Sequence, residues 1–172
     1  VINQVRSLAP MVYVSSHNSP PPVARPMRDW SDYPQLDAGV LVISDLHVPY
    51  HDTVLLGKVV DKAVDMGITR CIVAGDLLDS KQLGKFADQS EHTLEEEVDQ
   101  AHGVIVWLKS RFAQIDVFPG NHDARFARAV GNQISTRKLL EWACGNSATI
   151  HSHHHAYVGQ TWLVAHPGVY SR

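Results

Sequence analysis

Three short polar motifs, each directly after an apolar run, constrain this 172-residue chain most strongly. They read Asp-Leu-His at residues 45–47, Gly-Asp-Leu-Leu-Asp at 75–79 and Gly-Asn-His-Asp at 120–123. The apolar runs are rich in β-branched residues and predict buried strands at residues 40–43, 70–74 and 115–118. Open α/β sheets form their ligand sites at the carboxyl ends of strands. We therefore expect the three motifs to share one site.

Helical patterns separate these predicted strands. Residues 51–65 carry apolar side chains at helical spacing, and residues 135–144 form a further amphipathic segment. Residues 93–112 predict a long helix in which Thr93 and Glu96 form a capping box. We expect the acidic run at residues 95–97 to be a solvated helix start and not a metal cluster. The alternation of strands and helices predicts an α/β fold with parallel strands.

The two ends of the chain differ from this pattern. Residues 149–165 predict a β-hairpin with its turn at 159–160. Residues 1–38 are rich in proline, which favours extended conformations. We interpret residues 1–38 as an arm or linker, with a partner-docking segment as the alternative, and residues 39–172 as the folded domain.

The motif residues suit a pair of divalent metal ions. Asp76 has two carboxylate oxygens and can bridge both ions. Asp45 and His47 alternate along a strand end, so we expect both to point to one side and to hold the first ion. Asn121 offers an amide oxygen to the second ion, and His166 offers an imidazole after the apolar run at residues 161–165.

At these residues the chain resembles the calcineurin-like metallophosphoesterase superfamily. The pattern of that family runs D-x-H, G-D-x-x-D, G-N-H-D/E, a His after a strand, and G-H-x-H. The first three motifs are present in order and His166 matches the fourth, so the resemblance covers residues 40–166. It implies a four-layer α-β-β-α sandwich. The G-H-x-H motif, which gives one imidazole to each metal in the family, is absent from these 172 residues, so we expect an incomplete ligand set and a missing C-terminal part.

The resemblance also implies roles for residues outside the ligand set. His122 would contact the leaving-group or phosphate oxygen without binding metal, and Asp79 would orient His122 and raise its pKa. Asp123 either supports the site or caps the segment that follows. The nucleophile would be a metal-activated water, because no Ser-His-Asp arrangement or nucleophile elbow is present.

Other polar residues leave two interpretations open. Arg125 and Arg128 either contact phosphate or lie on a helix surface. His151, His153 and His155 share one face of a strand and either chelate metal or, as we prefer, lie on the surface of the hairpin. Ser80 occupies the position at which protein Ser/Thr phosphatases of the family carry an arginine, which argues against a protein substrate.

Composition excludes several classes of protein. The net charge of −3 gives no electrostatic indication of nucleic-acid binding. No apolar run is long enough to span a bilayer, and the first residues lack the core of a signal peptide. Cys71 and Cys144 are too few for a disulfide framework and indicate free thiols in a reducing compartment, which we take to be the cytoplasm.

Together these observations predict a hydrolase of phosphate monoesters or diesters that uses two ions of manganese, iron or zinc. The rival predictions are a nuclease of the same superfamily and a non-catalytic interaction domain. We expect the 172 residues alone to be a poor catalyst. We also expect an open apolar sheet face, covered by a second copy of the chain or by a C-terminal segment.

Overall fold

The computed structural model describes residues 35–36, 39–84, 87, 90–159 and 162–166. Their largest sheet is entirely parallel and has the strand order β2-β3-β4-β5. Its strands are β2 (Val40–Ile43), β3 (Arg70–Ala74), β4 (Gln114–Phe118) and β5 (Thr149–Ile150). The first three match the apolar runs of the sequence. The general α/β fold with parallel strands is therefore confirmed.

A second sheet has the order β1-β6-β7, in which β1 is parallel and β7 antiparallel to β6. Its strands are β1 (Gln35–Leu36), β6 (His155–Val158) and β7 (Trp162–Ala165). The predicted hairpin is thus confined to β6 and β7. The part of the prediction that included residues 149–150 is wrong, because β5 joins β4 in the larger sheet. Backbone pairing continues one residue further, where the His151 N–H donates to the Val117 carbonyl at 2.9 Å.

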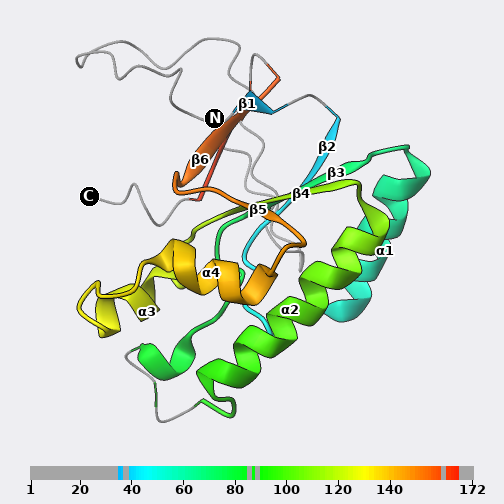
Figure 1. The fold of residues 1–172 in the computed structure, drawn as a ribbon. Helices are drawn as coiled ribbons and strands as arrows, with labels where there is room; N and C mark the ends of the chain where they lie inside the picture. The colour runs from blue at the N-terminus through cyan, green and yellow to red at the C-terminus, as the bar shows by residue number, and fades with distance from the viewer. Residues whose placement is uncertain (1–34, 37–38, 85–86, 88–89, 160–161, 167–172) are drawn as a thin grey trace, which may run out of the picture.

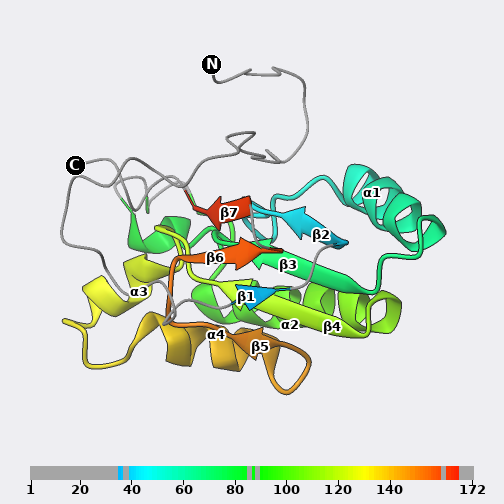
Figure 2. The same cartoon turned by 90° about the horizontal axis from the view of Figure 1, so that it is seen from above.

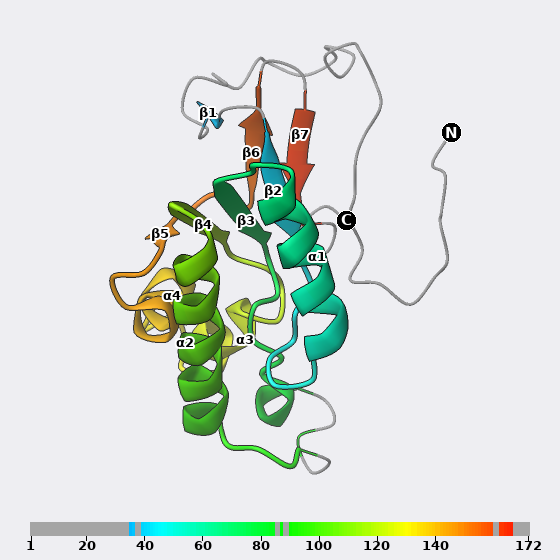
Figure 3. The same cartoon turned by 90° about the vertical axis from the view of Figure 1, so that its right-hand side faces the viewer.

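The helices lie on one side of the larger sheet and the smaller sheet lies on the other, as Figures 1 and 2 show. They are α1 (Thr53–Asp65), α2 (Leu94–Arg111), α3 (Ala124–Ala129) and α4 (Thr136–Cys144), with a short 3₁₀ turn η2 (Lys81–Leu83). Thr93 and Glu96 form the predicted capping box of α2. Helix α1 begins later than predicted, because Asp52 is its N-cap. Figure 3 gives a side view in which α1 and α2 run along the larger sheet.

Two apolar cores hold these layers together. The larger core contains buried side chains such as Val60, Val73 and Ile105, and joins α1 and α2 to the larger sheet. The smaller core lies between the sheets and contains Ile72, Ala74, Phe118, Ala156, Val158 and Val164. The expectation of an open apolar sheet face is therefore wrong for the described residues, because β6 and β7 cover it.

Most of the predicted arm, residues 1–34 and 37–38, lies outside the described residues, and so does Gln160 of the predicted turn. Gln35 and Leu36 form β1. None of the described helices combines the length and the apolar character that crossing a lipid bilayer requires.

Candidate metal centre

The three motifs meet at one edge of the larger sheet because β2, β3 and β4 are neighbours and parallel. Backbone hydrogen bonds join their loops. The Asp45 N–H donates to the Gly75 carbonyl at 3.1 Å, and the His47 N–H donates to the Asp76 carbonyl at 3.0 Å. The loop after β4 joins them, since the His122 N–H donates to Asp76 Oδ1 at 2.8 Å. The sheet thus brings the motif residues together, as the sequence predicts.

The backbone reaches this site through left-handed conformations at three of the candidate ligands. Asp45 has φ 55°, His47 has φ 47° and Asp76 has φ 52°. Such angles are uncommon outside glycine, and Asp and His are among the side chains that adopt them most often. The prediction that Asp45 and His47 share one side by strand alternation is wrong in its cause, because β2 ends at Ile43. Leu46 between them is buried.

Two histidines face the same pair of carboxylate oxygens. His166 Nε2 lies 3.4 Å from Asp45 Oδ1 and 3.3 Å from Asp76 Oδ2. His47 Nε2 lies 3.8 Å from the same Asp45 oxygen and 3.7 Å from the same Asp76 oxygen. Donors at about 2.0–2.1 Å from a tetrahedral ion are about 3.4 Å apart. Asp45, Asp76 and His166 therefore fit one divalent cation, and His47 lies somewhat further from the same two carboxylate oxygens.

His166 occupies a different place from the one predicted. The sequence assigned it to a second ion with Asn121, whereas its ring contacts Asp45 and Asp76, the residues that His47 also faces. Asp45, Asp76 and His166 make one of two groups of three ligating side chains found among the described residues. The reason is that β7 lies over β2 and delivers His166 to the Asp45 side of the site (Figure 2).

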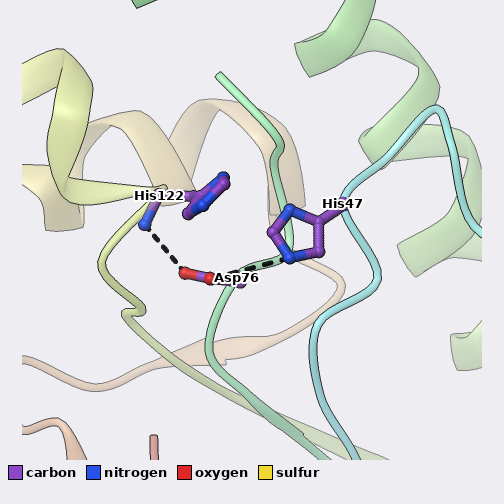
Figure 4. A group of neighbouring side chains, drawn as sticks. All are labelled: His47, Asp76 and His122. Carbon is purple, nitrogen blue, oxygen red and sulfur yellow. Dashed lines mark hydrogen bonds and ion pairs between the residues drawn. The ribbon is translucent and has the colours of Figure 1, made fainter. Parts of the chain in front are cut away.

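His47, Asp76 and His122 make the second group, shown in Figure 4. The two oxygens of Asp76 face different partners: Oδ2 faces the imidazoles of His47 and His166, and Oδ1 accepts the N–H of His122. Asp76 is 2% exposed. A buried carboxylate shared between two sides has the form that a bridging ligand needs.

Protonation of the site is set by these carboxylates. Burial alone lowers the pKa of His166, but hydrogen bonds to Asp45 and Asp76 outweigh burial and raise that pKa to about 10. Burial likewise opposes ionisation of Asp45, but bonds from His166, His47 and Ser44 hold its pKa well below the ordinary value. In the absence of a metal ion, His166 is therefore protonated, and its positive charge lies between the carboxylates of Asp45 and Asp76.

His122 lies beside the site with both ring nitrogens engaged. Its Nδ1 donates to the Asp79 carbonyl at 2.8 Å, and its Nε2 accepts from Arg125 Nη2 at 2.7 Å. As predicted, the hydrogen bond to Asp79 raises the pKa of His122, but the net shift of that pKa is downward. Burial is the largest influence, and with the charges of His47 and Arg125 it lowers that pKa. His122 is therefore a neutral imidazole in this arrangement.

Asp79 contacts both histidines through one carboxylate oxygen. Asp79 Oδ1 lies 2.9 Å from His47 Nδ1 and 3.2 Å from His122 Nδ1. The predicted contact with His122 is present, and the contact with His47 is an addition that the sequence did not indicate. Because Nδ1 of His47 faces Asp79, its Nε2 is the nitrogen that faces Asp45 and Asp76.

Asp123 supports the site and does not cap the next helix. Its Oδ2 accepts the N–H groups of Asp76 at 3.0 Å and Gly120 at 2.8 Å, and its Oδ1 accepts the Leu78 N–H at 2.9 Å. No side-chain cap bond is made to α3. Burial raises the pKa of Asp123 to about 6, although the backbone N–H groups favour its ionised form. The carboxylate ties the loops after β3 and β4 together.

Two glycines give the site its close packing. A Cβ atom at Gly120 would overlap the Asp76 carboxylate, and one at Gly75 would lie 2.7 Å from the His166 ring. Asn121 lies between Gly120 and His122, and both of these residues contact Asp76. The backbone of Asn121 therefore lies beside Asp76 as well. These contacts explain why the motifs need glycine at both positions.

The two arginines after the third motif reach back to it. Arg125 Nη1 donates to the Asp79 carbonyl at 3.1 Å, and Arg128 Nη2 donates to the Asn121 carbonyl at 3.0 Å. Arg128 is exposed on α3, as the helix-surface interpretation expects, whereas Arg125 is partly buried. Arg125 sits beside His122 at the site itself.

The histidine cluster after β5 has structural contacts. His151 Nε2 lies 2.8 Å from Asp116 Oδ1, and its ring stacks on Phe118 at 4.4 Å. His154 Nδ1 lies 3.0 Å from the Pro119 carbonyl. Within the described part of the chain, no group of three ligating side chains includes a residue of this cluster. The preferred interpretation of a surface position is nevertheless wrong for His155, which is 8% exposed.

Glu97 is a supporting residue that the sequence did not reveal. It belongs to the acidic run predicted to be solvated, yet it is completely buried and its Oε2 accepts the Ser80 N–H at 2.8 Å. Burial raises its pKa. Ser80 directly follows Asp79 and has φ 49°. The sequence offers one signal for this difference. Glu97 directly follows the capping-box residue Glu96, and this position turns its side chain toward the protein interior while its acidic neighbours face solvent.

Comparison with protein-family models, with curated proteins and with solved structures gave no match to this chain.

Proposed function

We propose that this chain is a metal-dependent hydrolase of phosphate monoesters or diesters, of the metallophosphoesterase kind that its motifs resemble. The observation that carries the proposal is that Asp45, Asp76 and His166 form one group of ligating side chains, while His47 faces the same two carboxylate oxygens. Two carboxylates and two imidazoles are suitable donors for manganese, iron or zinc. The proposal includes the four-layer sandwich, in which a further helical layer would cover the outer side of β1-β6-β7.

The proposed ion would be held by these four side chains. Asp76 Oδ1 and the amide of Asn121 would contribute to a second ion. A bound divalent cation would supply a water of lowered pKa and a positive charge for the phosphoryl oxygens. Binding requires that His166 lose its proton, since only neutral imidazole ligates metal.

Arg125 would bind the phosphoryl group, and His122 would position Arg125. Arg125 is fixed by the Asp79 carbonyl and by His122 Nε2, and two of its five N–H donors are used in these bonds. The remaining donors can bind anionic oxygens in the fork geometry typical of arginine. Asp79 orients the neutral ring of His122 through the contacts at Nδ1. His122 thereby holds Arg125 at the site, in place of the direct contact with a leaving-group or phosphate oxygen that the resemblance implies.

The test is hydrolysis of p-nitrophenyl phosphate and bis(p-nitrophenyl) phosphate by the full chain with manganese or zinc, together with the bound metal content. We expect activity that a chelator removes and the metal restores. Asp76→Asn should abolish both metal binding and turnover. Asp99→Asn, an exposed carboxylate on α2, is the matched control and should change neither. Stoichiometric metal binding without hydrolysis of either ester would contradict the proposed function and favour a non-catalytic domain.

A further inference from the structure

A pocket of about 230 Å³ adjoins the candidate metal centre. Two of the candidate ligands, Asp45 and His47, form one wall, so the pocket opens directly onto the proposed reaction point. The opposite wall comes from the turn before α1 and from the first turns of that helix. The complete lining is Asp45, Leu46, His47, Tyr50, His51, Asp52, Leu55 and Leu56. A group attached to a bound phosphoryl would therefore have this space within reach.

The apolar part of the lining comes from three leucines, and its polar part away from the candidate ligands comes from Tyr50, His51 and Asp52. Leu46 and Leu56 are buried side chains, and Leu55 is partly exposed. The only charges in the lining that are not candidate metal ligands come from acidic Asp52, whose Oδ1 accepts the Leu55 N–H at 2.9 Å as the cap of α1. A second phosphate or a carboxylate on the substrate would be repelled by this acidic wall.

Tyr50 adds an aromatic surface at the mouth of the pocket. Its backbone N–H donates to the His47 carbonyl at 2.7 Å, which fixes it next to a candidate ligand. Tyr50 as a whole is 44% exposed, although Lys81 Nζ and the centre of the His92 ring each lie 5.7 Å from the centre of its ring. Exposed aromatic rings beside a pocket stack readily on planar ligands. The geometry therefore suits a flat group better than a branched one.

We propose, on the basis of the function proposed above, that this pocket binds the alcohol portion of the ester and selects a single uncharged aromatic ring. The volume agrees with this size, because an apolar cavity of about 150 Å³ holds benzene in another protein. A ring bearing one or two small substituents thus fits within 230 Å³. The substrate class is an aryl or arylmethyl phosphoester, in contrast to a nucleoside polyphosphate or a protein side chain.

The test compares two non-hydrolysable probes, benzylphosphonate and methylphosphonate, as inhibitors of nitrophenyl phosphate hydrolysis by the metal-loaded full chain. Burial of the ring should make benzylphosphonate bind at least about tenfold more tightly. Leu55→Ala should reduce this ratio to less than about threefold by removing part of the wall. Val54→Ala is the matched control, since Val54 is 66% exposed and does not line the pocket.

Tyr50→Ala provides a second variant on an exposed side chain, so the test does not depend on how a core substitution folds. It should also lower the ratio. The pocket assignment would be overturned if the two phosphonates bound equally well, or if both variants left the preference for the benzyl group unchanged. Neither outcome would affect the proposed function, as long as the chain hydrolyses the ester. Absence of hydrolysis and of inhibition by either probe would instead overturn the proposed function.

Discussion

Replacement of Asp123 offers the sharpest test of how the site is assembled. This side chain is fully buried and accepts three backbone N–H groups, at 2.8, 2.9 and 3.0 Å, from the loops after β3 and β4. It does not face the proposed substrate. Its substitution therefore probes the scaffold of the site separately from the chemistry.

The magnitude follows from the groups left without a partner. A buried donor that loses its acceptor costs about 1–3 kcal/mol, and three donors lose theirs in Asp123→Ala. The costs within one network do not add fully, and the buried carboxylate is itself unfavourable to ionise, as its pKa of about 6 indicates. We expect Asp123→Ala to lower the free energy of unfolding by about 4 kcal/mol. Asp123→Asn keeps one acceptor oxygen and should lower it by about 2 kcal/mol.

Urea denaturation in the presence of a chelator measures these values without a contribution from bound metal. Asp99→Ala, an exposed aspartate on α2, is the control and should change the free energy of unfolding by less than about 0.5 kcal/mol. In the folded variants, metal affinity should fall because the loop that carries Asp76 is released. A loss below about 1 kcal/mol for Asp123→Ala would refute the view that this carboxylate joins the two loops.

Three further changes test other contacts. Gly120→Ala should lower the free energy of unfolding by about 1–3 kcal/mol and weaken metal binding at least tenfold, because the added methyl group displaces the Asp76 carboxylate. An unchanged metal affinity in calorimetric titration would disprove this close packing. Glu97→Ala should lower the free energy of unfolding in urea by about 2 kcal/mol, since it leaves the buried Ser80 N–H without an acceptor. Glu97→Gln keeps an acceptor oxygen and should lower it by less, and equal effects of the two variants would contradict the hydrogen bond. The folded-state pKa of Asp116 is lowered, because bonds from a histidine and an arginine outweigh its burial, so its stabilising effect exists above about pH 4 and is lost as the pH falls through that pKa. The stability difference between wild type and Asp116→Asn, about 3 kcal/mol at pH 7, should shrink toward pH 3, and a difference independent of pH would refute the assignment.

The sequence predicted the elements whose signals are local. Strands β2 and β3 appear as nearly continuous apolar runs, because helices cover one face of the larger sheet and the second sheet covers the other, and β4 follows the same pattern except at Asp116. Helix α2 carries its own start signal in Thr93 and Glu96. The short strand β5 was merged with the hairpin because Thr149 and Ile150 continue the same apolar alternation. Its true partner, β4, lies about thirty residues earlier.

The candidate site was predictable only as far as its residue types. The edge of a parallel sheet explains why the loops containing Asp45 and Asp76 meet. The contacts of Glu97 and Arg125 were not predictable, because they depend on how a loop and a helix fold back on each other. The neutral state of His122 likewise depends on a guanidinium that only the folded chain brings to its ring.

The left-handed backbone at Asp45, His47 and Asp76 limits which chemistry could ever be engineered into this centre. Asp, His and Asn tolerate such angles better than most residues, and they are also ligands for divalent ions. Cysteine and glutamate ligate metals equally well, but they lack this tolerance. Exchanging these positions for thiolates to favour softer metals would therefore require new loops as well as new side chains. The backbone angles at the three candidate ligands thus restrict which metal ions this centre could bind.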